Sequence, residues 1–222
     1  VTFHFGVPPL RVIEKAHSLG IAVGVTATSA EEAIAIETAG ADFIVAQGIE
    51  AGGHRGIFNP SAADEKLTAI DLTKKLVKCC SIPIVCAGAI MDGADIANAL
   101  KAGAVAAQLG TAFLCCDESG ASPAHKDYLL NEHDRGSLFT KGFSGRLARG
   151  IENEFIRLMK DKVNLPFPIQ NTMTASLRQL AAKTNNGEYQ SLWAGQDYAR
   201  TRNLSAKDLM LALKEELLIA IG

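Results

Sequence analysis

The sequence contains no run of about 18 uncharged apolar residues and no basic leader followed by an apolar stretch. The first absence argues against a membrane-spanning helix, and the second argues against a signal peptide. Basic blocks are missing too, since 22 Lys and Arg stand against 24 Asp and Glu for a net charge of -2. We therefore expect a soluble, cytoplasmic protein that binds neither nucleic acid nor a membrane.

The sequence also lacks a CxxC motif, and four of its cysteines form two pairs of adjacent residues. Such a pattern fits neither a disulfide framework nor a zinc knuckle, which favours a reducing compartment. No histidine stands at an interpretable spacing from a cysteine, so the sequence gives no support for a cysteine nucleophile. The five cysteines are Cys79, Cys80, Cys86, Cys115 and Cys116.

The chain also lacks an initiator Met, and its first residues, VTFHFGV, resemble the middle of a strand. We therefore expect that upstream sequence is absent from these 222 residues. With 48% hydrophobic residues, the chain has enough apolar material for one substantial core.

Short apolar runs alternate with helical patterns in the first half of the chain. Because the runs show little polar alternation, they indicate parallel strands buried on both faces, typical of an α/β protein. A Ser at position 29 with a Glu three residues later predicts a capping box. Strands are predicted at residues 2–7, 22–27, 43–47, 82–87 and 104–109, with helices at 10–19, 29–39, 64–78 and 92–100.

The pattern changes after Phe113, where helical periodicity dominates. We interpret residues 1–115 as a (β/α) core and residues 116–222 as a C-terminal helical cap with closing helices. The helices of the cap are predicted at residues 124–132, 148–160, 174–183 and 205–221, joined by loops with FSGR, LPFPIQN and WAGQ.

Residues 41–56 carry a buried strand followed by Gly52, Gly53 and His54. A histidine after glycines at a strand end is a candidate base or hydrogen-bond donor, although an isolated histidine is more often structural. His4 lies on an apolar strand, where a buried structural role competes with a functional one. The histidines at positions 17, 125 and 133 are expected to be solvated. Apart from Glu50 near His54, no convergent ligands are visible, so no metal site is predicted.

Two further strand ends carry glycine, at Gly88-Ala89 and at residues 108–111. Turns of this kind free backbone N–H groups that cradle a phosphate, and in a (β/α)₈ barrel the loops after the last two strands are the usual phosphate site. The alternative is that these glycines only end strands. Taken together, these glycine-containing strand ends favour a ligand-binding site over this alternative.

The segments QGIEAGGHRG, PIVCAGAIMDG, AAQLGTAFL, FSGRLARG and LWAGQ, in this order, resemble the nitronate monooxygenases, formerly called 2-nitropropane dioxygenases. That family consists of FMN-dependent (β/α)₈ TIM-barrel enzymes. The resemblance implies eight strands where we count five, so we expect an incomplete barrel that retains FMN poorly as an isolated chain.

The resemblance implies site residues position by position. His54 becomes the catalytic residue, and Gln47 and Gly52 lie against the flavin. Ala89 stands where the family usually has a second glycine, and its methyl group would either crowd a phosphate or be tolerated if its φ is negative. The FMN phosphate is expected on Gly88 and Ala89 and on Gln108, Leu109, Gly110 and Thr111.

The implied reaction is oxidation of an alkyl nitronate, or of a nitroalkane, by O₂ to a carbonyl compound and nitrite. Trp193 and Tyr198 are candidates to shield the pocket, with simple packing as the alternative. Three other interpretations remain open: a flavin-dependent enoyl-ACP reductase, an NAD(P)H:quinone reductase, and a truncated non-catalytic remnant. A homo-oligomer is compatible with all of them.

Overall fold

The computed structural model describes residues 1–222, which form two compact units. Unit 1 comprises residues 1–50, 56–109 and 215–222, and unit 2 comprises residues 51–55 and 110–214. A domain boundary between residues 115 and 116 stays a prediction. No helix of either unit combines the length and the apolar character needed to cross a membrane.

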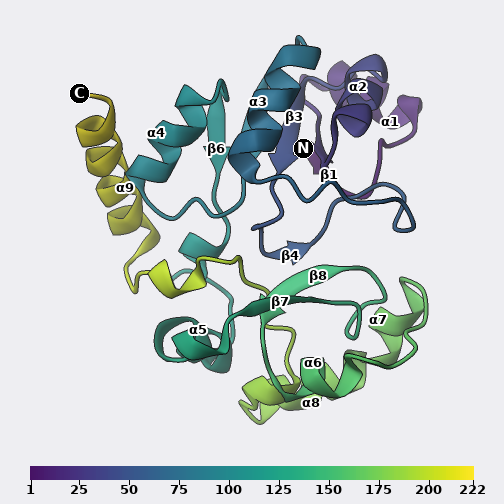
Figure 1. The fold of residues 1–222 in the computed structure, drawn as a ribbon, viewed down its shortest axis with the longest axis vertical. Helices are drawn as coiled ribbons and strands as arrows, with labels where there is room; N and C mark the ends of the chain where they lie inside the picture. The colour runs from purple at the N-terminus through teal and green to yellow at the C-terminus, as the bar shows by residue number, and fades with distance from the viewer. The chain divides into compact units, whose positions relative to one another are not determined.

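Unit 1 is built on a sheet of five parallel strands in the order β1-β2-β3-β5-β6 (Figure 1). All five strands fall inside the ranges predicted from the sequence, which confirms the α/β class and the barrel-type βα repeat. The strands are β1 (Thr2–Phe3), β2 (Gly24–Ala27), β3 (Phe43–Gln47), β5 (Ile84–Ala87) and β6 (Ala106–Gln108).

Helices follow the strands of this sheet, and α3 packs on β3 and β5 while α4 packs on β6. The helix predicted from residue 64 begins only at residue 69, so that prediction was wrong by one turn. The reason is the cap: the side chain of Thr68 accepts a hydrogen bond from the Asp71 N–H. The helices are α1 (Leu10–Ser18), α2 (Ala30–Thr38), α3 (Ala69–Cys79), α4 (Gly93–Lys101) and the end of α9 (Ala206–Ile221).

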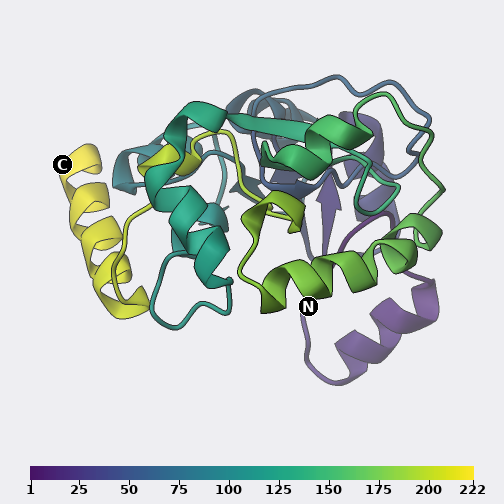
Figure 2. The same ribbon diagram turned by 90° about the horizontal axis from the view of Figure 1, so that it is seen from below.

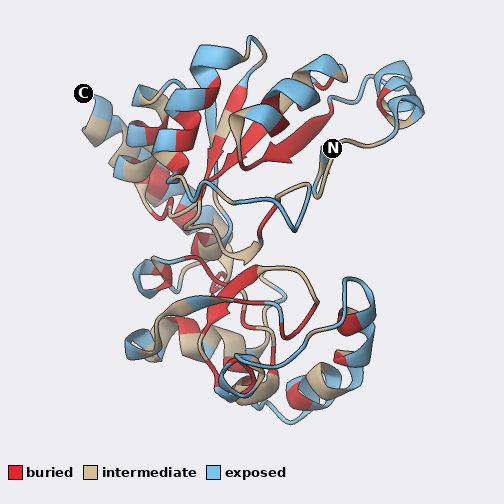
Figure 3. Ribbon diagram, turned by 45° about the vertical axis from the view of Figure 1, so that its right-hand side comes forward, coloured by how far each residue is buried: buried red, intermediate tan, exposed pale blue.

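The core of unit 1 lies between the sheet and its helices, and Figure 3 shows strands of the sheet, such as β2, β3 and β5, mostly in the colour of buried residues. β-Branched and small residues of the strands meet leucines and isoleucines of α2 and α3, as expected for strands covered on their faces. Fully buried members of this core include Val25, Ile36, Ile44, Leu72 and Leu76.

The predicted capping box at the start of α2 is only half present. The Ser29 side chain accepts from the Glu32 N–H, as predicted. The Glu32 carboxylate does not return to the Ser29 backbone; it accepts from the Thr28 N–H and hydroxyl and from the Phe58 N–H at 2.6–2.8 Å. This buried carboxylate therefore anchors the loop that follows residue 56.

Unit 2 contains an antiparallel sheet in the order β4-β8-β7, which the sequence patterns did not predict. The strands are β4 (Gly53–His54), β7 (Ser137–Thr140) and β8 (Ala148–Ile151). The prediction of a helix from residue 148 was therefore wrong for its first turn. Residues 148–151 pair with strands on both sides, and the helix starts only after Asn153, whose side chain caps it.

Unit 2 has an apolar core of its own, to which helix α5 contributes, and Figure 2 shows the helices of this unit from below. Leu129, Ile151, Leu192 and Tyr198 are buried there. Helices α5 and α8 both contact the short 3₁₀ turn at residues 187–189. The helices are α5 (Pro123–Asn131), α6 (Glu154–Met159), α7 (Ile169–Met173) and α8 (Ala175–Lys183).

Candidate active site

Three adjacent strands of unit 1 end at the same level. Gln47 pairs in register with Ala87, and Ala87 pairs with Gln108. Since neighbouring strands lie about 4.8 Å apart, the three positions form one row at the carboxyl edge of the sheet. Ligands of parallel α/β proteins bind at this edge. The predicted residues of unit 1 thus converge on one row.

The Gly88-Ala89 turn leaves this row in a left-handed conformation, with φ of 129° at Gly88 and 53° at Ala89. The tolerance of the Ala89 methyl group was expected to depend on a negative φ, and that condition is not met. The adjacent N-terminus of α4 is occupied by side chains, because Asp92, Asp95 and Glu216 accept its N–H groups. These N–H groups of the helix start are therefore not available to an anion at the turn.

The other predicted residues of unit 1 differ in what their side chains do. The Gln47 amide oxygen accepts a hydrogen bond of 2.7 Å from the Gly56 N–H, which holds the start of the next loop. Leu109 packs its side chain against the core, whereas Gln108 is exposed. Gly56 itself is enclosed, since a β-carbon there would lie 2.9 Å from the His4 ring.

His54 lies in unit 2, where side chains from distant segments surround its imidazole. Its Nε2 atom is 2.7 Å from the hydroxyl oxygen of the buried Ser144, in the FSGR segment. The Trp193 ring centroid is 5.6 Å from that of His54, and the Phe167 ring stands edge-on to His54 at 6.2 Å. Strand β4 also fixes the His54 backbone against Ala148.

The WAGQ segment connects the remaining predicted residues of unit 2. A β-carbon at Gly52 would lie 2.5 Å from the Gly195 backbone nitrogen, so glycine is required there by close backbone approach. The Gly195 N–H donates to the Thr111 hydroxyl at 2.9 Å. Gly110 is exposed, and a β-carbon there would meet no atom within 4 Å. The contact of Gly52 with a flavin stays a prediction.

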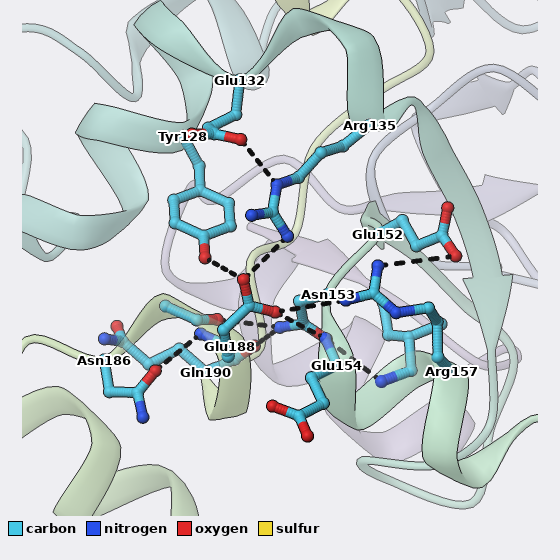
Figure 4. A network of polar contacts seen from close by, with 12 residues as sticks. Tyr128, Glu132, Arg135, Glu152, Asn153, Glu154, Arg157, Asn186, Glu188 and Gln190 are labelled. Atoms are coloured by element: carbon cyan, nitrogen blue, oxygen red, sulfur yellow. Dashed lines mark hydrogen bonds and ion pairs between the residues drawn. The ribbon is translucent and has the colours of Figure 1, made fainter.

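A polar network fixes the segment that leads to Trp193 (Figure 4). Asn153 is fully buried; its amide nitrogen donates to the carbonyl oxygens of Gly187 and Gln190 at 2.9 and 2.8 Å. Glu188 accepts from the Tyr128 hydroxyl, and Arg135 lies 2.8 Å from the Glu188 carboxylate. Burial and this contact raise the pKa of Tyr128 to about 12. The segment before Trp193 is thereby held at several points.

Two expectations about aromatic and histidine side chains were wrong. His125 is not solvated: its Nε2 atom is buried without a hydrogen-bond partner, and burial lowers the pKa of the ring to about 4. Tyr198 does not shield a pocket, because it is buried in the core and its hydroxyl donates to the Glu132 carbonyl at 2.7 Å. The local sequence pattern around these two residues does not reveal that their side chains face the core.

The cysteine thiols show no activation. Burial raises the pKa of Cys86, Cys115 and Cys116, which keeps these thiols protonated at neutral pH. All five cysteines are free.

The predicted site residues therefore fall into two groups, one in each unit, and sequence reasoning missed several neighbours of His54. Ser144 and Phe167 lie in the FSGR and LPFPIQN segments, but nothing in their spacing links them to a histidine some 90 residues earlier. Unit 1 holds Gln47, Gly88, Ala89, Gln108 and Leu109, and unit 2 holds Gly52, His54, Gly110 and Thr111.

Comparison with known proteins gives the family. The family model described as nitronate monooxygenase matches residues 1–216. The chain belongs to the nitronate monooxygenase family. Relatives in this family include a nitronate monooxygenase of Paraburkholderia phytofirmans, 44% identical over 98% of this chain and 60% of its own length. The nitronate monooxygenase of Pseudomonas aeruginosa is 42% identical, over 98% of this chain and 63% of its own.

Solved structures share the fold of this chain. The nitroalkane oxidase from Streptomyces ansochromogenes is similar with a TM-score of 0.96 and 42% identity, covering all of this chain and 64% of its own. FabK from Thermotoga maritima has a TM-score of 0.81 and 28% identity, covering all of this chain and 68% of its own. The chain thus spans about three fifths of the length of the curated nitronate monooxygenases that it matches.

Proposed function

We propose that this protein oxidises alkyl nitronates with O₂ to a carbonyl compound and nitrite, with FMN as cofactor. The observation that carries the proposal is the set of contacts around His54, where the AGGH, FSGR and WAGQ segments meet within unit 2. These segments carry the resemblance to the family, and the family match covers residues 1–216. Neutral nitroalkanes are a second substrate class in this proposal.

His54 acts in this proposal on the substrate itself. Its imidazole would hydrogen-bond the nitronate oxygens, or remove the α-proton when a neutral nitroalkane binds. The contact with Ser144 supports this role, because a hydrogen bond at one ring nitrogen fixes the orientation of the ring. Trp193 and Phe167 would exclude water from the same ring by covering it with apolar surface.

FMN, when bound, supplies the electron transfer that protein side chains cannot perform. The strand-end row of unit 1 supports a phosphate-bearing cofactor, because three adjacent strands end there at one level and Gln108 is exposed. The Ala89 methyl group, at a positive φ, is the feature of this row that would crowd a phosphate. We propose that Gly88, Ala89 and Gln108 to Thr111 hold the phosphate and that Gln47 and Gly52 lie against the flavin ring. FMN compared with riboflavin tests this, since only FMN should gain affinity from the phosphate contacts.

The reaction is tested with purified protein and FMN at saturating concentration, because poor retention is expected for the isolated residues. Added ethylnitronate should consume O₂ and release nitrite, which colorimetric detection and an oxygen electrode follow together. A folded, FMN-loaded protein that yields no nitrite contradicts the proposal.

A reductase is the alternative function. If NAD(P)H reduces the bound flavin rapidly and nitronates do not react, the enoyl-ACP or quinone reductase alternative replaces the proposal.

A cytoplasmic location and a homo-oligomeric state stay predictions, which fractionation and light scattering would test.

A further inference from the structure

Gln170, in α7, connects two loops that both reach His54. Its side chain is buried, with 7% of its surface exposed. The amide nitrogen donates to the Gly142 carbonyl at 2.7 Å, and the amide oxygen accepts from the Leu165 N–H at 3.1 Å. The amide nitrogen and the amide oxygen of Gln170 therefore each bind the backbone of a different loop.

The first loop leads from Gly142 through Phe143 to Ser144, whose hydroxyl lies 2.7 Å from His54 Nε2. Thr174, directly after α7, strengthens this hold, because its hydroxyl donates to the Phe143 carbonyl at 2.6 Å. Helix α7 thus controls the backbone of the two residues that precede the serine and hence the position of its hydroxyl.

The second loop leads from Leu165 to Phe167, whose ring stands edge-on to His54. The two loops are in backbone contact with each other. Gly145 has φ of 86°, and a β-carbon there would collide with the Leu165 carbonyl oxygen and the Phe167 nitrogen. A displacement of one loop is therefore passed to the other.

We propose that Gln170 is a positioning residue, which holds the Ser144 hydroxyl and the Phe167 ring in their places beside His54. It does not touch the imidazole itself. A buried amide with both ends bonded to backbone groups is costly to replace, since removal leaves a donor and an acceptor unpaired on the two loops. The link to catalysis rests on the proposed function, whereas the effect on the His54 ring does not.

The competing explanation is that Gln170 only stabilises the fold. Tyr198 provides a control in the same unit, since it is buried with 2% exposed and its hydroxyl donates to the Glu132 carbonyl at 2.7 Å. Neither residue lies on the two loops at His54 or in the segment of residues 187–190 that leads to Trp193.

The experiment compares Gln170→Met with Tyr198→Phe, because each variant keeps the approximate size and the neutrality of the side chain but removes its buried hydrogen bonds. The imidazole of His54 is followed by NMR in protein labelled with ¹⁵N-histidine, with His54→Asn providing the assignment. In Gln170→Met we expect the titration midpoint of His54 to move by about 0.4–1 pH unit, the size of one altered hydrogen bond, with a change in the Nε2 shift.

Tyr198→Phe should also lower thermal stability, while the His54 midpoint and Nε2 shift stay as in the parent protein. Equal NMR changes in both variants, or none in Gln170→Met, would overturn the inference. In FMN-loaded protein, the pH profile of kcat/KM should move with the NMR midpoint. If the NMR change occurs but the parent protein oxidises no nitronate, the proposed function fails and the positioning role stands.

Discussion

Unit 1 places its candidate residues on turns that directly follow parallel strands, whereas unit 2 places His54 among side chains that come from 90 or more residues away in the chain. In unit 1 the strand register alone brings Gln47 and Gln108 into one row. In unit 2 the position of the imidazole depends on buried polar side chains, such as Ser144, Asn153 and Gln170. The difference shows that one protein uses local and long-range means to fix functional loops.

The two means differ in their energetics. A turn that follows a buried strand is stabilised by the apolar core beneath it, and its cost is mainly backbone strain. A loop tied by a buried amide depends on a few hydrogen bonds whose loss leaves unpaired groups in a region without water. Substitutions should therefore have larger effects on stability in unit 2 than at comparable positions of unit 1.

The largest effect is expected on activity at His54. Replacement of His54 by Asn should lower turnover of a neutral nitroalkane by about 10²–10⁴-fold, the usual contribution of a general base. Turnover of a preformed nitronate should fall less, because no proton is removed. His17→Asn, at an exposed histidine paired with Asp42 in unit 1, serves as the control. Initial rates of nitrite release measure both, and equal rates in parent and His54→Asn would remove His54 from the mechanism.

The N-caps of α6 in unit 2 and of α3 in unit 1 allow the stability of the two units to be compared directly. Asn153→Ala removes the cap of α6, leaves the Gln190 carbonyl unpaired and takes one of two hydrogen bonds from the Gly187 carbonyl, so the free energy of unfolding should fall by about 3 kcal/mol. Thr68→Ala removes the cap of α3, which is exposed, and should cost about 1 kcal/mol. Urea unfolding measures both values. Equal losses would show that the buried network adds nothing to the cap.

His125 of unit 2, whose Nε2 atom is buried, should make stability depend on pH. Its pKa in the folded protein is lowered to about 4 by burial, below the ordinary value of 6.5. The neutral ring therefore stabilises the fold fully above pH 6.5, and the free energy of unfolding should fall by about 3 kcal/mol as the pH drops toward 4. Urea unfolding at several pH values tests this. If His125→Gln loses the same stability over this range, another group is responsible.

The smallest effect concerns backbone strain in unit 1. Ala89 has φ of 53°, a conformation that costs a residue with a β-carbon about 1 kcal/mol, so Ala89→Gly should raise stability by up to that amount. Lys66→Gly is the matched control, because Lys66 has the same φ in an exposed loop. Thermal unfolding should show a similar gain in both, while FMN titration should respond only at position 89. A loss of stability in both variants would show that neither position is strained.

The sequence by itself determined the five strands of unit 1, their parallel class, and the strand ends at Gln47, Gly88 and Gln108. These features follow from hydrophobic periodicity and glycine placement, which act over a few residues. The family motifs around His54 were also visible in the sequence. The start of α3 was not predicted, because a cap at Thr68 outweighed an earlier helical pattern.

Only the tertiary structure decided what surrounds the histidine. Strand β8 forms because β4 and β7 pair with it, although its residues fit a helical pattern when viewed alone. The Nε2 atom of His125 is buried and Ser144 reaches His54 because segments far apart in the chain pack together, and no local spacing encodes such contacts. Hydrogen bonds between distant segments depend on the folded backbone, so their partners become known only with the fold.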